Sequence, residues 1–323
     1  MSLFDCSSIA RFSMARSAAL AALAAFAMAA CQTTGAGVAG EPGSGALSDT
    51  VSGRRDAAPF LRGTSVVPVS TPGGGTPDEA FNIVFLADSD AYNGLATDAD
   101  FSRFVADVND VAENGFRQVE GLRVNETLLH FYALKVPGRV TTAPCPSNLE
   151  FPEDVIERDS LFADAFIILH DHETSEVRDC ADTNTRYASA GKGRGPDGVL
   201  RRKLGVAVHE AMHAVFLLPD EYSGGGMWAT EPPVVFENPG ECADYRAAVL
   251  GMTGGCAPIM SFRGERWHKA DDRPFGREIM DPKRNPFLDP EPFGPSDWIR
   301  AREVMRRISP DVAEPALPGG PTS

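Results

Sequence analysis

Basic residues are scarce in this sequence. Of 323 residues, 30 are Lys or Arg and 45 are Asp or Glu, so the formal net charge is −15. A protein that binds nucleic acid needs clustered cations to neutralise phosphates. The composition therefore argues against a nucleic-acid partner. Long apolar runs are also missing, because the Ala-rich run at residues 18–30 is too short to span a bilayer.

Several catalytic signatures are absent as well. The sequence contains no G-x-S-x-G segment, which excludes the nucleophile turn of the α/β-hydrolases. It contains no G-x-x-x-x-G-K segment, which excludes a P-loop that binds nucleoside triphosphates. The cysteines form no close C-x-x-C pair, so a cysteine-rich zinc site is also excluded.

The N-terminus has the pattern of an export signal. Arg11 and Arg16 precede the apolar run, and Cys31 follows it. Residues 28–31, M-A-A-C, resemble a bacterial lipobox, which implies cleavage before Cys31 and acylation of that residue. We therefore expect residues 1–30 to be a lipoprotein signal peptide, with a lipid at Cys31 as the only membrane attachment. The expected location is the bacterial cell envelope, at the outer membrane or in the periplasm, with plain secretion as the alternative.

Composition divides the rest of the chain. Residues 31–77 are rich in Gly, Ser, Thr, Pro and Ala, which predicts a flexible tether. We expect a catalytic domain at residues 78–310 and a disordered tail at residues 311–323. Four cysteines remain beyond residue 31, and an exported chain favours disulfides. Three pairings are possible, and the two short loops favour Cys145 with Cys180 and Cys242 with Cys256.

Periodicity predicts alternating strands and helices. The apolar residues 80–87 indicate a buried strand, and helical spacing follows at residues 98–119. Further strands are expected at residues 127–136 and 162–169. A long helix is predicted at residues 197–217, with Asp197 as its N-cap and Pro219 beyond its end. A last helix is expected at residues 296–308. This order is typical of a layered α/β or α+β domain.

The strongest chemical signal is the H-E-A-M-H segment at residues 209–213. On a helix, His209 and His213 lie one turn apart on one face, so both can bind a single zinc ion. Glu210 is placed to act as the general base on a metal-activated water. The flanking residues are uncharged, and three polar groups buried in an apolar helix need a metal to compensate them. The motif therefore predicts a zinc peptidase.

A catalytic zinc site needs a third protein ligand. The metzincin pattern H-E-x-x-H-x-x-G-x-x-H does not continue, because Phe216 and Pro219 occupy its Gly and third His positions. The nearest oxygen ligands are Asp220 and Glu221, where the chain turns back after the helix. Both remain candidates on the residues alone.

The segment H-E-x-x-H-x-x-x-x-L-x-D-E-Y at residues 209–222 resembles the signature of the bacterial IgA-specific metalloendopeptidase family. The similarity extends over about residues 81–308. The resemblance implies a zincin or metzincin-like domain with a mixed sheet and the H-E-x-x-H helix, and Asp220 as the third ligand with Glu221 next. A metzincin-like domain also has a methionine turn beneath the metal, for which Met280 is the better candidate and Met260 the alternative.

Other residues keep competing interpretations open. His268 precedes Met280 by a spacing that resembles the leishmanolysin-type peptidases, and it is the rival third ligand. A gluzincin would instead use Glu237 or Glu241, although the Pro and Gly between them make a ligand-bearing helix doubtful. Three further side chains have open roles. His170 and His172 could line the cleft, form a second weak metal site or be loop residues, and Tyr222 could donate a hydrogen bond to the oxyanion or pack.

The sequence therefore predicts a zinc-dependent endopeptidase that acts on protein or peptide substrates, with Glu210 as base and His209, His213 and Asp220 as ligands. We expect it to be a monomer. The alternative class is a lipid-anchored zinc-containing binding protein without useful turnover.

Overall fold

The structure is a computed structural model that describes residues 66–74, 76–152, 162–173, 177, 179–194, 197–270, 278–280 and 292–315. The expected signal peptide, the acylated Cys31 and residues 316–323 lie outside the described residues. Within the described part of the chain, every helix is too short or too polar to cross a membrane.

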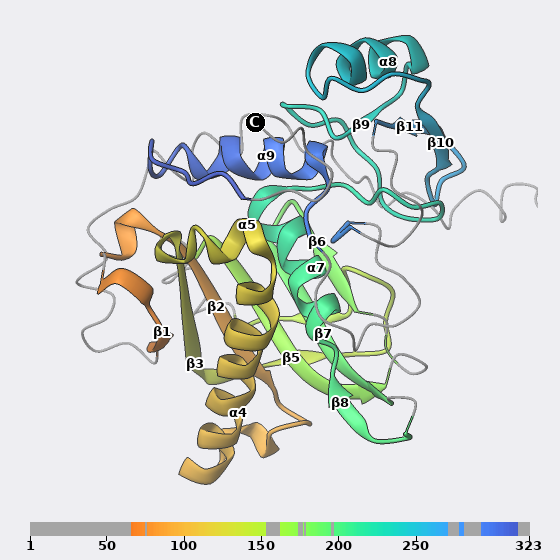
Figure 1. The fold of residues 1–323 in the computed structure, drawn as a ribbon. Helices are drawn as coiled ribbons and strands as arrows, with labels where there is room; N and C mark the ends of the chain where they lie inside the picture. The colour runs from red at the N-terminus through yellow and green to blue at the C-terminus, as the bar shows by residue number, and fades with distance from the viewer. Residues whose placement is uncertain are drawn as a thin grey trace, which may run out of the picture. The chain divides into compact units, whose positions relative to one another are not determined.

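The central element is a mixed sheet, which confirms the mixed α/β architecture expected from the sequence (Figure 1). Its strand order is β1-β3-β2-β5-β7-β6. The four inner strands are β3 (Leu129–Val140), β2 (Phe81–Asp88), β5 (Ala165–Glu173) and β7 (Tyr187–Arg194). They run parallel to one another, whereas β1 (Val66–Ser70) and β6 (Cys180–Asp182) pair antiparallel at the two ends. Two short strands, β4 (Leu149–Glu150) and β8 (Leu200–Arg202), pair antiparallel with β3 and β7, respectively.

Both faces of the sheet are covered, which explains why β2 is buried along its whole length and is apolar except at Asn82 and Asp88. Successive side chains of a strand point to opposite faces. Ile83 and Phe85 accordingly join the larger core cluster, which contains α4 (Asp98–Asp110) and α7 (Leu204–Phe216). Val84 and Leu86 join a separate cluster on the other face. Figure 1 shows α4 and α7 on the same side of the sheet.

The remaining helical segments are short. The helix α4 continues into a π-helical turn (Val111–Gly115) and a 3-10 turn (Phe116–Gln118), and α5 (Glu120–Arg123) follows. The last helix is α9 (Pro295–Met305). Other 3-10 turns are found at Pro72–Gly74, Pro77–Glu79, Asn93–Leu95 and Glu126–Leu128.

A smaller unit follows the long helix. It contains a three-stranded antiparallel sheet in the order β10-β11-β9, formed by Ala257–Met260, Arg266–Lys269 and Val235–Phe236, together with α8 (Pro239–Ala248). A disulfide between Cys242 and Cys256 links α8 to the segment before β10, and a second joins Cys145 to Cys180. Both expected pairings are confirmed.

The folded region is longer at both ends than residues 78–310. Residues 66–70 lie in the expected tether but form the edge strand β1 against β3. Residues 311–315 lie in the expected tail but pack on the domain. There the Ala313 amide donates to Asn125 at 2.7 Å, and the Trp298 indole donates to Glu314 at 2.8 Å. Both parts of the domain boundary are therefore corrected.

Two expectations about helices are also corrected. Asp197 does not cap the long helix, because residues 200–202 continue as strand β8 and Lys203 occupies the N-cap of α7. Asp197 instead accepts the Val199 amide and pairs with Arg201. The segment with Pro239 and Gly240 does form a helix, α8, because Pro at the first turn and Asn238 as the cap are both favourable there.

Candidate metal centre

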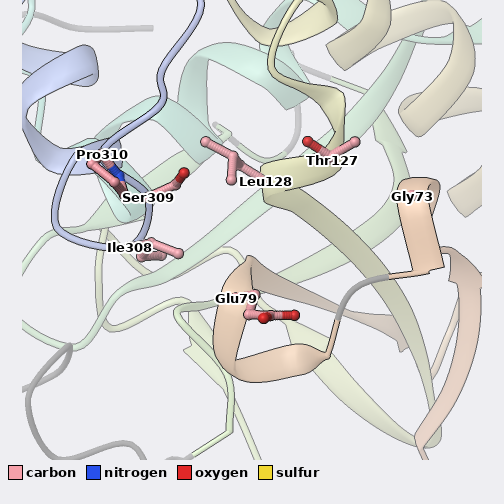
Figure 2. Close-up of a pocket in the computed structure, with 7 residues that line it drawn as sticks. All are labelled: Gly73, Glu79, Thr127, Leu128, Ile308, Ser309 and Pro310. Carbon is pink, nitrogen blue, oxygen red and sulfur yellow. The ribbon is translucent and has the colours of Figure 1, made fainter.

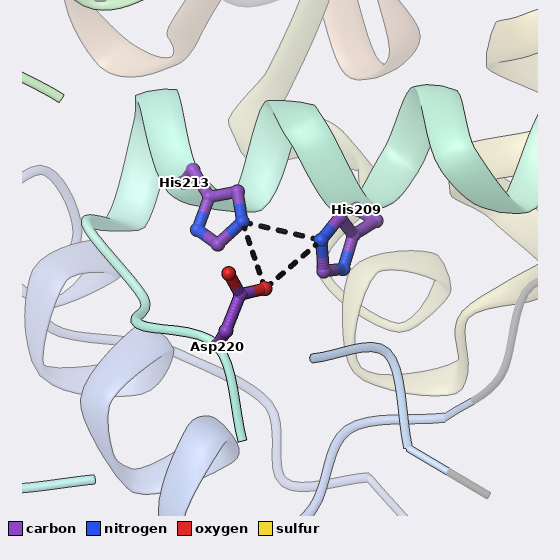
Figure 3. Close-up of side chains that lie close together, drawn as sticks. All are labelled: His209, His213 and Asp220. Carbon is purple, nitrogen blue, oxygen red and sulfur yellow. Dashed lines mark hydrogen bonds and ion pairs between the residues drawn. The ribbon is translucent and has the colours of Figure 1, made fainter. Parts of the chain in front are cut away.

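The helix α7 carries His209, Glu210 and His213, and all three are buried. The helix ends at Phe216, and its C-cap residue, Leu217, adopts a left-handed conformation with φ of 54°. A residue with a β-carbon rarely takes this conformation. The turn that it makes folds the chain back on the helix and brings Asp220 beneath the two histidines (Figure 3).

The three side chains form a small, nearly equilateral triangle. The Nε2 atoms of His209 and His213 are 3.2 Å apart, and each lies 3.3 Å from Oδ1 of Asp220. A tetrahedral zinc ion with bonds of about 2.0–2.1 Å separates its ligand atoms by about 3.3 Å. The observed triangle therefore has the dimensions of three corners of a zinc tetrahedron.

Backbone carbonyls orient both imidazoles. Nδ1 of His209 lies 2.8 Å from the Ile279 carbonyl oxygen, and Nδ1 of His213 bonds to the Leu218 carbonyl oxygen. A carbonyl can only accept, so each Nδ1 donates. In a neutral imidazole the lone pair then lies on Nε2, and both lone pairs face Oδ1 of Asp220. Metal-binding histidines usually have such partners on their outer nitrogen.

The third corner of the triangle is an ionised carboxylate. Burial raises the pKa of Asp220, whereas the charge and hydrogen bonds of His213 and His209, when both rings are protonated, lower it below its ordinary value; a bound cation would supply the same positive charge. Its Oδ1 atom is buried and has no hydrogen-bond donor of good geometry in the described structure. Two lone pairs and a carboxylate oxygen thus converge where a cation would satisfy all three, so the residues fit a metal ion.

A glycine-rich loop holds Asp220 in place. The Gly226 amide donates to Oδ2 of Asp220 at 2.6 Å, and the Asp220 amide donates to the Gly226 carbonyl at 2.8 Å. Oδ2 is therefore occupied and Oδ1 is left for the triangle. The G-G-G segment at residues 224–226 was not singled out in the sequence, although three successive glycines are a recognisable sign of close backbone approach.

Two aromatic rings border the histidines. The Tyr222 ring centroid lies 6.3 Å from that of His209, and the Trp228 ring centroid lies 5.6 Å from that of His213. The Trp228 indole donates to the Leu217 carbonyl at 3.2 Å, which ties the ring to the end of α7. Both side chains are partly exposed, so the two rings flank the histidines at the protein surface.

The segment that contains Met280 lies beside the histidine-bearing helix. The Ile279 carbonyl accepts from His209, and the Met280 carbonyl accepts the Glu221 amide at 3.0 Å. Met280 is fully buried, whereas Met260 is 44% exposed. Of the two methionines, Met280 is therefore the one that is buried and bonded beside the candidate metal centre.

The structure brings together His209, His213 and Asp220 but not the rival ligands. His268 lies on β11, where it pairs with Phe236 and Pro258. Glu237 and Glu241 are exposed at the start of α8. Among the described residues, the triangle of His209, His213 and Asp220 is the only group of three such side chains close enough to share a metal.

His170 and His172 lie apart from the triangle, on β5. His170 is fully buried, with Nε2 3.2 Å from Oδ1 of Asp179, and His172 lies 3.7 Å from Asp88. Asp179 also pairs with Lys203 at the start of α7. His170 therefore belongs to a buried polar network with Asp179 and Lys203, whereas His172 is partly exposed beside Asp88.

A pocket of about 310 Å³ lies elsewhere in the domain (Figure 2). It is lined by Gly73, Glu79, Thr127, Leu128, Ile308, Ser309 and Pro310. None of the triangle residues lines it, so it has no part in the candidate metal centre.

Comparison with known proteins gives no further guide to this site. No protein-family model matches the chain, and no curated protein matches it. What the site does is derived below from its own residues.

Proposed function

We propose that this chain is a zinc-dependent endopeptidase with a zincin or metzincin-like domain. Its zinc ligands are His209, His213 and Asp220, and its general base is Glu210. The observation that carries the proposal is the triangle of ligand atoms, 3.2 to 3.3 Å on each side, in which both histidines present Nε2. The H-E-x-x-H motif also supplies Glu210 as a general base, which a site that only stores zinc does not need.

The reaction assigns one task to each group. When bound, zinc lowers the pKa of a water and polarises the peptide carbonyl. Glu210 takes the proton from that water and delivers it to the leaving amine, which keeps protons balanced over the cycle. The carbonyls of Ile279 and Leu218 hold the imidazoles in the tautomer that binds metal. Gly226 holds the Asp220 carboxylate in position.

The surrounding fold supports the zincin assignment. A mixed sheet lies against the H-E-x-x-H helix, and a buried methionine, Met280, follows a carbonyl that orients His209. These are the features that the resemblance to the IgA-specific metalloendopeptidase family implies. The IgA preference itself is not proposed for this chain, because no residue described above selects an immunoglobulin.

The two disulfides support an exported protein, since cytosolic thiols stay reduced. We therefore retain the proposal that the chain is a monomeric lipoprotein, acylated at Cys31, that acts in the cell envelope or outside the cell. Its substrates are then proteins or peptides of the same compartment.

The test combines metal analysis with hydrolysis of casein. The purified protein is expected to contain one zinc per chain and to cleave casein. Glu210→Gln should keep the zinc and lose cleavage, typically by two to four orders of magnitude. Glu241→Gln, an exposed carboxylate on α8, is the matched control and should change neither property.

The outcomes separate the two classes of function. Zinc binding without hydrolysis of any protein substrate would make the chain a zinc-containing binding protein. Failure of the purified chain to bind zinc, even after reconstitution, would refute both.

A further inference from the structure

Two large apolar side chains are exposed together at the end of strand β10. Met260 is 44% exposed and Phe262 is 66% exposed, the highest value among the large apolar side chains that the structure describes as exposed. Between and before them, Ser261 is 5% exposed and Ile259 is 1% exposed. Met260 ends β10 and Phe262 lies in the turn that follows it, so the two exposed side chains stand on either side of the buried Ser261 at the tip of the hairpin.

The exposure of the pair is not the result of a loose turn. The Ser261 hydroxyl accepts the amides of Arg263 and Glu265 at 3.2 and 3.1 Å, and the Ser261 amide donates to the Glu265 carbonyl at 2.9 Å. Strand β10 is also paired with β11 along its length. The two apolar side chains are therefore held outward by a rigid hairpin.

This hairpin is bonded directly to the loop that holds Asp220. The Phe262 amide donates to the Gly225 carbonyl at 3.0 Å, and the Gly224 amide donates to the Met260 carbonyl at 2.7 Å. Gly225 in turn contacts the Asp220 side chain, because a β-carbon there would be 2.3 Å from Cβ of Asp220. The backbone of the glycine loop at residues 224–226 thus separates Met260 and Phe262 from Asp220, the third proposed ligand.

We infer that Met260 and Phe262 form a binding surface, here called the Met260/Phe262 shelf, for a large apolar side chain of the polypeptide substrate beside the scissile bond. The inference rests on the proposed function and names its substrate class. Water contact at two large apolar side chains is unfavourable, and covering them with an apolar group recovers that free energy.

The surroundings favour a substrate side chain as the occupant. The shelf is continuous with the loop of the metal centre, and the glycines between them have no side chains to cover it. The Arg263 guanidinium lies 5.2 Å from the Phe262 ring centroid, which leaves the rest of the ring open. Peptides with Leu or Phe next to the cleaved bond fit this surface, whereas those with Ser or Asp gain nothing from it.

The test measures binding without turnover. Glu210→Gln protein loaded with zinc is titrated with fluorescent casein-derived peptides that carry Leu or Ser at one position, and fluorescence anisotropy gives Kd. We expect the Leu peptide to bind roughly tenfold more tightly. Phe262→Ser and Met260→Ser, added to this background, should reduce that preference at least roughly threefold each, with Ser-peptide binding unchanged.

Val199→Ser is the matched control, since Val199 is 49% exposed on a different hairpin, and it should keep the full preference. Equal binding of Leu and Ser peptides, or a preference that survives both shelf substitutions, overturns the inference. Zinc content and casein cleavage are measured on the same protein with Glu210 intact. If the shelf substitutions abolish the preference for the Leu peptide but the protein does not cleave casein, the Met260/Phe262 shelf is supported and the proposed peptidase activity is refuted.

Discussion

Gly225 lies against the side chain of Asp220 so closely that a β-carbon at residue 225 would be 2.3 Å from Cβ of Asp220 and 2.6 Å from its Cγ and Oδ2 atoms. Non-bonded atoms cannot lie this close together, so any residue larger than glycine at position 225 must displace the Asp220 carboxylate. The carboxylate also forms the third corner of the ligand triangle. The geometry of the candidate metal centre is therefore tied to the absence of a side chain at residue 225.

Gly225→Ala is expected to weaken zinc binding at least roughly tenfold, because second-shell changes of this kind typically cost 10- to 100-fold in metal affinity. Competition with a chromophoric zinc chelator measures the effect. Gly255→Ala is the control, since a β-carbon there would meet nothing within 4 Å. Equal zinc affinity in the two variants would show that Asp220 does not bind the metal.

The third ligand is tested by substitution. Asp220→Ala should leave fewer than one zinc per chain after dialysis, since it removes one corner of the triangle. His268→Ala should retain the zinc, because His268 is paired with Phe236 and Pro258 on β11. Elemental analysis of both variants decides between the two ligands. Loss of zinc in His268→Ala with retention in Asp220→Ala would reverse the assignment.

The buried ion pair of Lys203 and Asp179 joins the start of α7 to the segment before β6. Lys203→Met should lower the free energy of unfolding by about 3–5 kcal/mol, because it removes the ammonium group that pairs with the buried Asp179 carboxylate. Adding Asp179→Asn should recover part of that loss. Urea denaturation measures both changes.

The exposed ion pair of Arg201 and Asp197 provides the comparison. Arg201→Met should change the free energy of unfolding by only about 0–1 kcal/mol. A loss as small in Lys203→Met would mean that the buried pair does not hold the helix to the sheet.

His170 predicts how stability depends on pH. Burial, together with the nearby Arg202, lowers the pKa of His170 to about 3, whereas an unfolded histidine titrates near 6.5. Below about pH 6.5 the unfolded chain binds a proton that the folded chain does not. This contribution to stability is therefore complete above about pH 6.5 and is lost, by about 1.4 kcal/mol per pH unit, as the pH falls towards 3.

Urea titrations at about pH 7.5 and about pH 5 check this expectation. Both proteins are kept free of metal with a chelator, so that the zinc ligands titrate alike in each. His170→Gln should lose about 2 kcal/mol less than the wild type between the two pH values. The same loss in both proteins would show that His170 is not responsible.

Much of the fold follows from burial patterns that the sequence displays. The expected strand at residues 80–87 matches β2 within one residue at each end, because a strand covered on both faces is mostly apolar. The apolar residues around the H-E-x-x-H segment likewise predict a helix there, but they do not predict where that helix starts. Lys203 caps α7 without a side-chain bond, and burial of residues 207–216 outweighs the capping preference of Asp197.

The missed features depend on contacts that are distant or unusual. Strand β1 contains Pro68 within a Gly- and Ser-rich region, and only an edge position beside β3 makes it a strand. Of the site, His209, Glu210 and His213 are adjacent in sequence and are found by spacing. The carbonyl that orients His209 belongs to Ile279, which is 70 residues away in the sequence. The left-handed turn at Leu217, which brings Asp220 to the histidines, has no signature in residue type.

All three proposed ligands come from one short stretch, residues 209–220, whereas the sheet is assembled from strands spread over the whole domain. Closing a short loop costs little chain entropy, and closing a long one costs more. If the chain is exported in extended form and binds zinc, as we propose, it can therefore gather its ligands before its parallel strands have paired. The ion would then act as an early organiser of folding, and the supply of zinc outside the cytoplasm would govern how fast the protein matures.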